Sequence, residues 1–117
     1  MKTKKYSRET LRKEVKSILE GSGNQVNLIF SMGESSEDCE TITHPDLKSK
    51  EPVYTGQCVF FKGNYYRGRV LTNPTWKDIL IEANWASERE GDHRFLESVD
   101  EMYCRDDIRY FEFFFGS

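Results

Sequence analysis

Two stretches of the chain place apolar residues at helical spacing. The first predicts a helix over about residues 7–20, with Ser7 as its N-cap and Gly21 and Gly23 at its end. Its apolar positions recur every three or four residues and form one stripe: Leu11, Val15, Ile18 and Leu19. The stripe predicts that one side of this helix packs against a core.

The second stretch predicts a helix over about residues 74–90. Asn73 is a suitable cap, and Pro74 is well tolerated at a first helical position. The main apolar stripe consists of Trp76, Ile79, Leu80, Ala83 and Ala86. Ile81 and Trp85 form a further strip, so we expect this helix to make contacts on more than one side.

Strand patterns occupy much of the remaining chain. β-Branched and aromatic residues predict strands at residues 25–31, 53–61, 65–72 and 108–115. The second and third of these are joined by Lys62, Gly63 and Asn64 and predict a hairpin. Residues 92–104 fit both helical and strand spacing. We favour a strand, because a short turn at residues 105–107 would then pair it with the last strand.

Residues 32–52 lack such periodicity and are rich in glycine, serine and acidic residues. We expect a mobile or functional acidic loop there. The whole order predicts a single α+β domain over residues 1–117, with a mainly antiparallel sheet and a C-terminal aromatic strand. We expect the N-terminal helix and the second helix to pack on this sheet.

Aromatic residues must supply much of the core. The chain has eight Phe, six Tyr and two Trp, and these rings make up 14% of its residues. The longest unbroken apolar stretch, residues 58–61, is far shorter than the roughly 20 residues that a membrane-spanning helix needs. The first thirty residues also lack the apolar segment of a secretory signal. We therefore expect a cytoplasmic protein that does not act at a membrane.

Cysteine and acidic positions indicate no metal or cofactor. Cys39, Cys58 and Cys104 form no C-x-x-C pair, so neither a disulfide framework nor a zinc module is indicated. We expect Cys58 to be a small buried hydrophobic residue. The possible ligands between Glu37 and Asp46 match neither a calcium loop nor a structural zinc site. We expect no metal and no cofactor.

Two basic segments define a nucleic-acid-binding alternative. Four cations lie three or four residues apart and would align along one side of the first helix: Lys5, Arg8, Arg12 and Lys16. In the predicted hairpin, Tyr65, Arg67 and Arg69 share a strand face and could stack on bases or bind phosphates. The first 16 residues carry seven Lys or Arg and two Glu, so the net charge of -3 leaves -8 on the rest of the chain. Because that charge repels a polyanion, we expect nucleic acid not to be the partner.

A small-molecule or enzymatic alternative rests on residues near the second helix. Asp92 and His93 could act as acid and base in a pocket lined by Trp76, Trp85 and the terminal aromatic residues. No nucleophile or glycine-rich anion site stands beside them in the sequence. A loop or capping role for Asp92 and His93 is therefore the simpler interpretation.

An apolar surplus favours a binding module over an enzyme. In the last strand, Tyr110 and Phe114 lie on the opposite face from three phenylalanines, so both faces are largely apolar. Two helices on opposite faces of the sheet would bury this surplus. Otherwise Trp85, Tyr110 and Phe114 remain for a pocket or a partner. We expect a non-catalytic binding or regulatory module that acts through another protein or as a homo-oligomer.

Overall fold

The computed structural model describes residues 3–29, 41–91 and 93–116. The described residues form two α-helices, α1 (Arg8–Gly21) and α2 (Trp76–Ala86), and a short 3-10 helix, η1 (Ser87–Arg89), directly after α2. The strands are β1 (Thr3–Ser7), β2 (Thr41–Pro45), β3 (Gln57–Lys62), β4 (Tyr66–Arg67), β5 (Leu71–Thr72), β6 (Phe95–Arg105) and β7 (Ile108–Gly116). The predicted α+β fold is confirmed. None of the described helices is long and apolar enough to span a bilayer.

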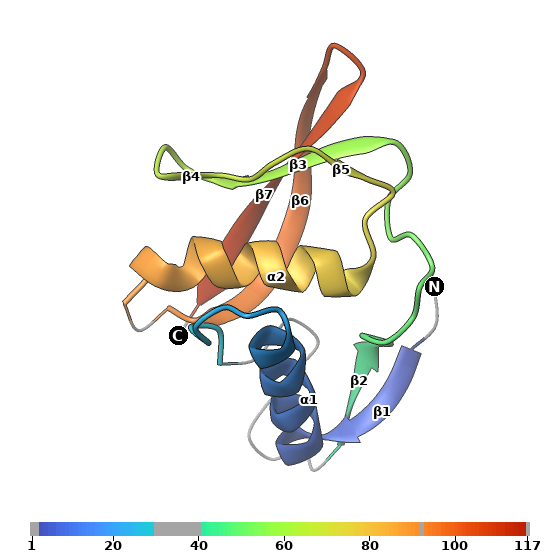
Figure 1. Ribbon diagram of the computed structural model, residues 1–117, viewed down its shortest axis with the longest axis vertical. Helices are drawn as coiled ribbons and strands as arrows, with labels where there is room; N and C mark the ends of the chain where they lie inside the picture. The colour runs from blue at the N-terminus through green and yellow to red at the C-terminus, as the bar shows by residue number, and fades with distance from the viewer. Residues whose placement is uncertain (1–2, 30–40, 92, 117) are drawn as a thin grey trace.

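Five strands form a mainly antiparallel sheet (Figure 1). Its order is β4-β3-β7-β6, and β4 and β5 pair with opposite ends of β3. β3 and β7 are parallel, whereas the other pairs are antiparallel. The predicted hairpin is confirmed, although its first strand begins at Gln57 and not at residue 53, and its second strand is interrupted between β4 and β5. The strand favoured over residues 92–104 is also confirmed, as β6.

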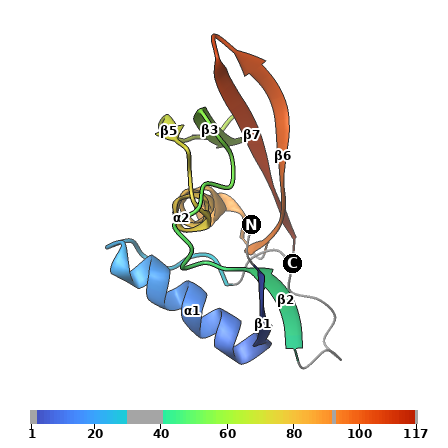
Figure 2. The same cartoon turned by 90° about the vertical axis from the view of Figure 1, so that its right-hand side faces the viewer.

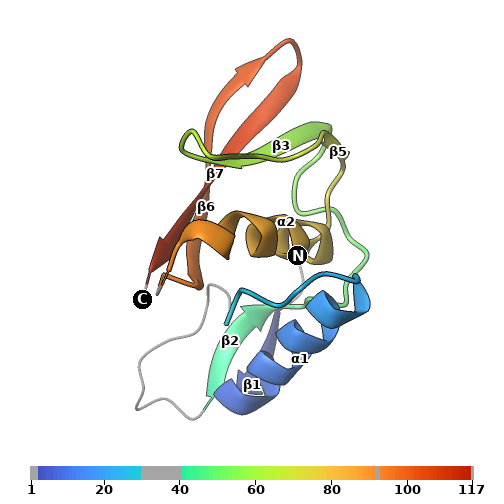
Figure 3. The same cartoon turned by 60° about the vertical axis from the view of Figure 1, so that its left-hand side comes forward.

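Helix α2 covers one face of this sheet. Figures 1 and 2 show α2 between α1 and the strands β3, β4 and β5. β1 and β2 form a separate two-stranded antiparallel sheet beside α1 (Figure 3). Neither described helix covers the other face of the five-stranded sheet (Figure 2). The arrangement in which the two helices lie on opposite faces of the sheet is therefore wrong.

Aromatic rings fill the space between α2 and the sheet, as the composition predicts. Phe60 is fully buried and stacks on Phe111 and Phe113, with ring centroids 5.1 and 5.6 Å apart. The predicted stripe of α1 joins the same core through Leu11, Val15 and Leu19. Rings from the sheet and aliphatic side chains from both helices thus make one core.

Polar side chains define where both helices begin. Ser7 caps α1, as predicted. Helix α2 begins later than predicted, because Thr75 and Asp78 form a reciprocal capping box there. Asn73 instead has a positive φ of 49°, and its side chain accepts a hydrogen bond of 2.6 Å from the Gly56 N–H. Asn73 therefore ties the approach to α2 to the loop before β3.

Residues 25–29 form no strand, so that prediction is wrong for the described part of the segment. Their backbone bonds to Asn84, a buried side chain of α2. Asn84 Oδ1 accepts from the N–H groups of Asn27 and Leu28 at 2.8 and 2.9 Å, and its Nδ2 donates to the Gln25 carbonyl at 2.8 Å. One amide thus supplies the hydrogen bonds that a neighbouring strand would otherwise supply.

Part of the acidic segment predicted as a loop is a strand. Thr41–Pro45 forms β2 and pairs with β1 in register from Thr3 opposite Pro45 to Ser7 opposite Thr41. Neither strand has the apolar alternation that identifies strands in a sequence. Residues 32–40 of the predicted loop lie outside the described residues.

Candidate functional site

The sheet face opposite α2 carries a row of aromatic side chains. Side chains alternate along β3 and β7, so Val59, Phe61 and Tyr110 lie on the opposite face from Phe60 and Phe111 in the core. Figure 2 shows α2 on one side of these strands and no described helix on the other. We call this surface the open sheet face, defined by Val59, Phe61, Arg67, Tyr103, Tyr110 and Phe114.

The rings and one cation of this face contact one another in series. The Arg67 guanidinium lies 5.3 Å from the centre of the Tyr110 ring, and its Nη2 donates to the Tyr110 hydroxyl at 3.1 Å. Tyr110 stacks on Tyr103 with centroids 4.6 Å apart, and Tyr103 lies 6.2 Å from Phe61. A cleft of about 300 Å³ opens between these side chains and the β3–β4 turn. The contacts hold the rings in place before any partner binds, which lowers the entropic cost of binding.

Exposure is greatest on the β6 side of the face. Tyr103 is 49% exposed and the neighbouring Met102 is 50% exposed, whereas Val59 and Tyr110 are buried. The free energy falls when a partner excludes water from exposed apolar side chains next to buried rings. Burial of the open sheet face by a partner would therefore stabilise a complex.

Charge is divided between the two sides of the open sheet face. Lys62 and Arg67 lie on β3 and β4. On β6, Asp100 lies opposite Glu112 of β7, and alternation places both carboxylates on the open side. Glu112 accepts a hydrogen bond of 3.0 Å from the Gly63 N–H, and Asp100 is exposed. The exposed Arg67 therefore places a positive charge on the β4 side of the face, and the exposed Asp100 places a negative charge on the β6 side.

Among the described strands β6 lies at the end of the sheet, and its outer edge is poorly suited to pairing with another strand. Shifts in register occur between Leu96 and Ser98 and between Glu101 and Tyr103. Asp100 and Glu101 would also repel the same strand of a second copy. A partner is thus expected on the face of the sheet and not at its edge.

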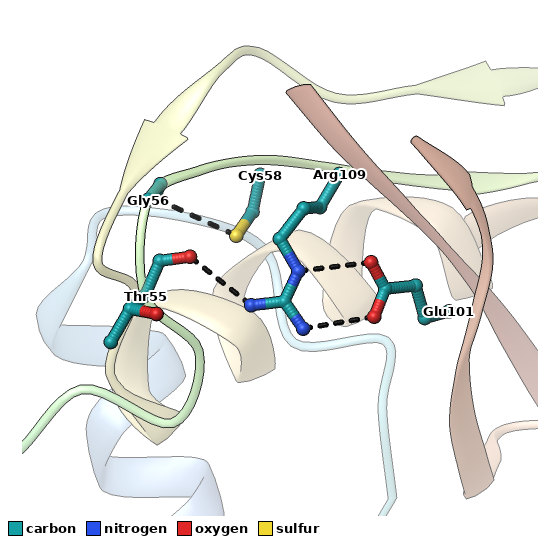
Figure 4. Close-up of polar contacts among 5 residues, drawn as sticks. All are labelled: Thr55, Gly56, Cys58, Glu101 and Arg109. Carbon is teal, nitrogen blue, oxygen red and sulfur yellow. Dashed lines mark hydrogen bonds and ion pairs between the residues drawn. The ribbon is translucent and has the colours of Figure 1, made fainter. Parts of the chain in front are cut away.

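On the covered side, Arg109 ties the β6–β7 hairpin to the loop before β3 (Figure 4). Its guanidinium makes hydrogen bonds of 2.8 and 2.9 Å with the Glu101 carboxylate and donates to the Thr55 carbonyl at 3.1 Å. The hydrogen bond from Arg109 lowers the pKa of Glu101. This cluster fixes the position of β6, and hence of Tyr103, relative to β3.

Cys58 lies beside that cluster and is buried, as expected. Its thiol donates to the Gly56 carbonyl at 3.7 Å (Figure 4), and burial raises the pKa of the thiol. Cys104 is exposed, and Cys39 lies outside the described residues. Within the part of the chain that the structure describes, no three His, Cys, Asp or Glu side chains could hold a metal ion.

Two of the three predicted partner-binding residues lie on the open sheet face. Tyr110 is at its centre, and Phe114 lies beneath the Lys62 ammonium, which is 5.0 Å from the ring centre. The third, Trp85, lines a separate cleft beside α2. Tyr103 was not predicted, because the register shifts of β6 disturb the alternation that would have assigned its face.

One of the four cations predicted to align on the first helix lies outside that helix. Lys5 belongs to β1, whereas Arg8, Arg12 and Lys16 lie on α1. Lys16 forms an exposed ion pair of 3.8 Å with Glu20. The row is therefore shorter than expected.

The cations of the predicted hairpin serve two different surfaces. Arg67 belongs to the open sheet face and also borders the cleft that contains Trp85, whereas Arg69 lines only the latter. The Tyr65 hydroxyl donates a hydrogen bond to Glu90. The single strand face predicted for these three residues is interrupted at Gly68, because β4 ends at Arg67.

The predicted pocket lined by both tryptophans is not formed. Trp76 is buried in the core and Trp85 is exposed, and their nine-residue separation on α2 corresponds to about 13 Å along the helix axis. His93 is exposed, and its backbone N–H donates to the Glu90 carbonyl at 2.9 Å. Asp92 lies outside the described residues.

The chain matches no protein-family model, no curated protein and no solved structure.

Proposed function

We propose that this chain is a small binding module that self-associates through the open sheet face. The observation that supports the proposal is the series of rings Phe61, Tyr103 and Tyr110 on a face that no described helix covers. Tyr103 and Phe61 still contact water, and removing such rings from water is the main favourable contribution to protein association. Tyrosine is also enriched among the residues that contribute most.

The charge distribution favours a second copy as the partner. In a two-fold symmetric dimer the same surface of each copy faces the other, so its two sides must complement each other. An axis through the centre of the face brings Lys62 and Arg67 of one copy toward Asp100 of the other. Complementary charges of this kind favour the correct orientation and disfavour others.

Tyr103→Glu is expected to abolish self-association, because it would place an unpaired carboxylate among rings that the dimer removes from water. Phe114→Glu should act in the same direction. Sedimentation velocity at micromolar concentration should show a dimer for the wild-type chain and a species of 13.8 kDa for either variant.

Val70→Glu is the matched control. Val70 is 47% exposed, close to the value for Tyr103, but lies between β4 and β5. We expect this variant to sediment as the wild type does. A wild-type chain that remains at 13.8 kDa at high concentration would contradict the proposal, and so would equal loss of association in Tyr103→Glu and Val70→Glu.

A further inference from the structure

A second cleft, of about 530 Å³, lies between α2, the segment from β4 toward β5 and the residues after α1. Figure 1 shows α2 running beside β4. The side chains that carry its chemistry are Tyr66, Arg69, Glu82 and Trp85, whereas Arg67 borders the cleft but directs its guanidinium to Tyr110 on the open sheet face. We call it the Glu82 cleft. Its volume lies in the range of about 300–1,000 Å³ that small-molecule sites occupy.

Glu82 is a carboxylate with unused hydrogen-bonding capacity. The residue is only 5% exposed, and its Oε1 accepts a hydrogen bond of 2.8 Å from the Tyr66 hydroxyl. A carboxylate offers about four acceptor positions. Burying a charged group that is only partly hydrogen-bonded is costly, so a ligand with N–H donors would stabilise this site.

Gly68 leaves room for the carboxylate. The Gly68 N–H donates to the Phe60 carbonyl at 2.8 Å, which holds this backbone in place. A Cβ at this position would collide with Glu82 Oε1 and would lie 3.1 Å from the Phe60 carbonyl oxygen. The missing side chain therefore allows Glu82 to lie against β3 and the segment after β4.

Trp85 and Arg69 provide two further groups that a ligand in the cleft would contact. Trp85 follows Glu82 by three residues on α2, so both lie on the same side of the helix, and Trp85 is 44% exposed. Arg69 is exposed and makes no hydrogen bond within the described part of the chain. The cleft thus combines a buried acceptor, a flat exposed ring and an available cation.

These groups restrict the class of ligand. An alkylammonium group would pair with Glu82, but the charge of Arg69, which acts on Glu82, would repel it. A neutral ring edge with N–H donors avoids this repulsion and can stack on Trp85. A negatively charged group on the same molecule could then pair with Arg69.

We propose that the Glu82 cleft binds a guanine nucleotide. Guanine carries two adjacent donors, N1–H and the 2-amino group, on one edge of its ring, and both can donate to one carboxylate. The base stacks on Trp85 and the phosphate pairs with Arg69. Adenine and cytosine each place an acceptor nitrogen beside their amino group, so that nitrogen would face a carboxylate oxygen.

Calorimetric titration of the full chain with GMP tests the proposal. We expect binding by the wild type and at least tenfold weaker binding by Glu82→Gln, because the amide nitrogen would oppose one of the guanine donors. Glu82→Gln retains an oxygen that accepts from Tyr66, so the variant should fold. Glu9→Gln is the control, because Glu9 lies at the start of α1 whereas Ser22, which lines the cleft, follows its end.

Two further measurements identify the groups involved. Inosine monophosphate, which lacks the 2-amino group, should bind more weakly than GMP, and AMP should bind weaker still. Quenching of tryptophan fluorescence by GMP should disappear in Trp85→Phe, which retains the buried Trp76.

The guanine could come from a free nucleotide or from single-stranded RNA. The pentanucleotide UUGUU, titrated beside GMP with UUAUU as its control, distinguishes these sources by which of the two binds more tightly. Absence of binding to both GMP and UUGUU would overturn the proposal. Equal affinity for GMP and AMP, or unchanged affinity in Glu82→Gln, would overturn it as well.

Discussion

Asn84→Ala is expected to lower the free energy of unfolding by about 3 kcal/mol, because it removes three hydrogen bonds worth roughly 1 kcal/mol each. Asn84 is fully buried and bonds to the backbone of Gln25, Asn27 and Leu28. Without the amide, backbone groups of this segment lose their partners, and Leu28 loses the contact that holds it in the core. Urea denaturation at neutral pH measures the difference.

Asn64→Ala is the control for this substitution. Asn64 is exposed in the turn between β3 and β4, and we expect its replacement to change the free energy of unfolding by no more than about 0.5 kcal/mol. Similar small effects of both substitutions would show that residues 25–28 are held by other contacts.

The Asn84 contact also explains why one predicted strand is absent. The alternation of Val26 and Leu28 predicts a strand, and Leu28 is indeed buried. The hydrogen-bond partners, however, come from a side chain 56 or 57 residues later in the chain. A periodic pattern shows which side chains are buried, but it does not show whether a strand or a side chain satisfies the backbone.

The elements that the sequence predicts correctly are those whose signals are local. Helix α1 has a cap and a single apolar stripe, and β7 has a dense run of β-formers after a two-residue turn at Asp106 and Asp107. Pairing of β6 with β7 then follows from their adjacency. The parallel pairing of β3 with β7 joins segments about 50 residues apart, and no local signal specifies it.

The two candidate surfaces likewise differ in whether a local signal in the sequence identifies them. Tyr110 and Phe114 could be assigned to a possible interface, because a strand that is apolar on both faces must cover two surfaces. Glu82 gave no such signal, since one carboxylate within a helix normally faces water. Its burial depends on Tyr66 and Gly68 of the hairpin, and hence on tertiary structure.

Glu82→Gln is expected to raise the free energy of unfolding at neutral pH, on the order of 1 kcal/mol, because it replaces a buried charge with a neutral group of the same shape. Burial raises the pKa of Glu82 above its usual 4.5, and Asp78 raises it further, while the Tyr66 hydrogen bond and the Arg69 charge oppose this shift. The folded chain therefore binds the proton more tightly than the unfolded chain does. Stability of the wild type is consequently lost as the pH rises from about 4.5 through the folded-state pKa.

Urea denaturation between pH 3 and 7 measures the difference in the free energy of unfolding between Glu82→Gln and wild type. This difference should shrink toward zero as the pH falls below about 4.5, because Glu82 then becomes protonated in both the folded and the unfolded chain. Glu101→Gln provides a control of opposite sign. The pKa of Glu101 is lowered by its hydrogen bond from Arg109, so its contribution to stability is present above about pH 4.5 and is lost as the pH falls through the folded-state pKa. Glu101→Gln should therefore be less stable than wild type at neutral pH. A Glu82→Gln variant that is also less stable there would mean that the carboxylate stabilises the free protein, and that its burial needs no ligand to offset it.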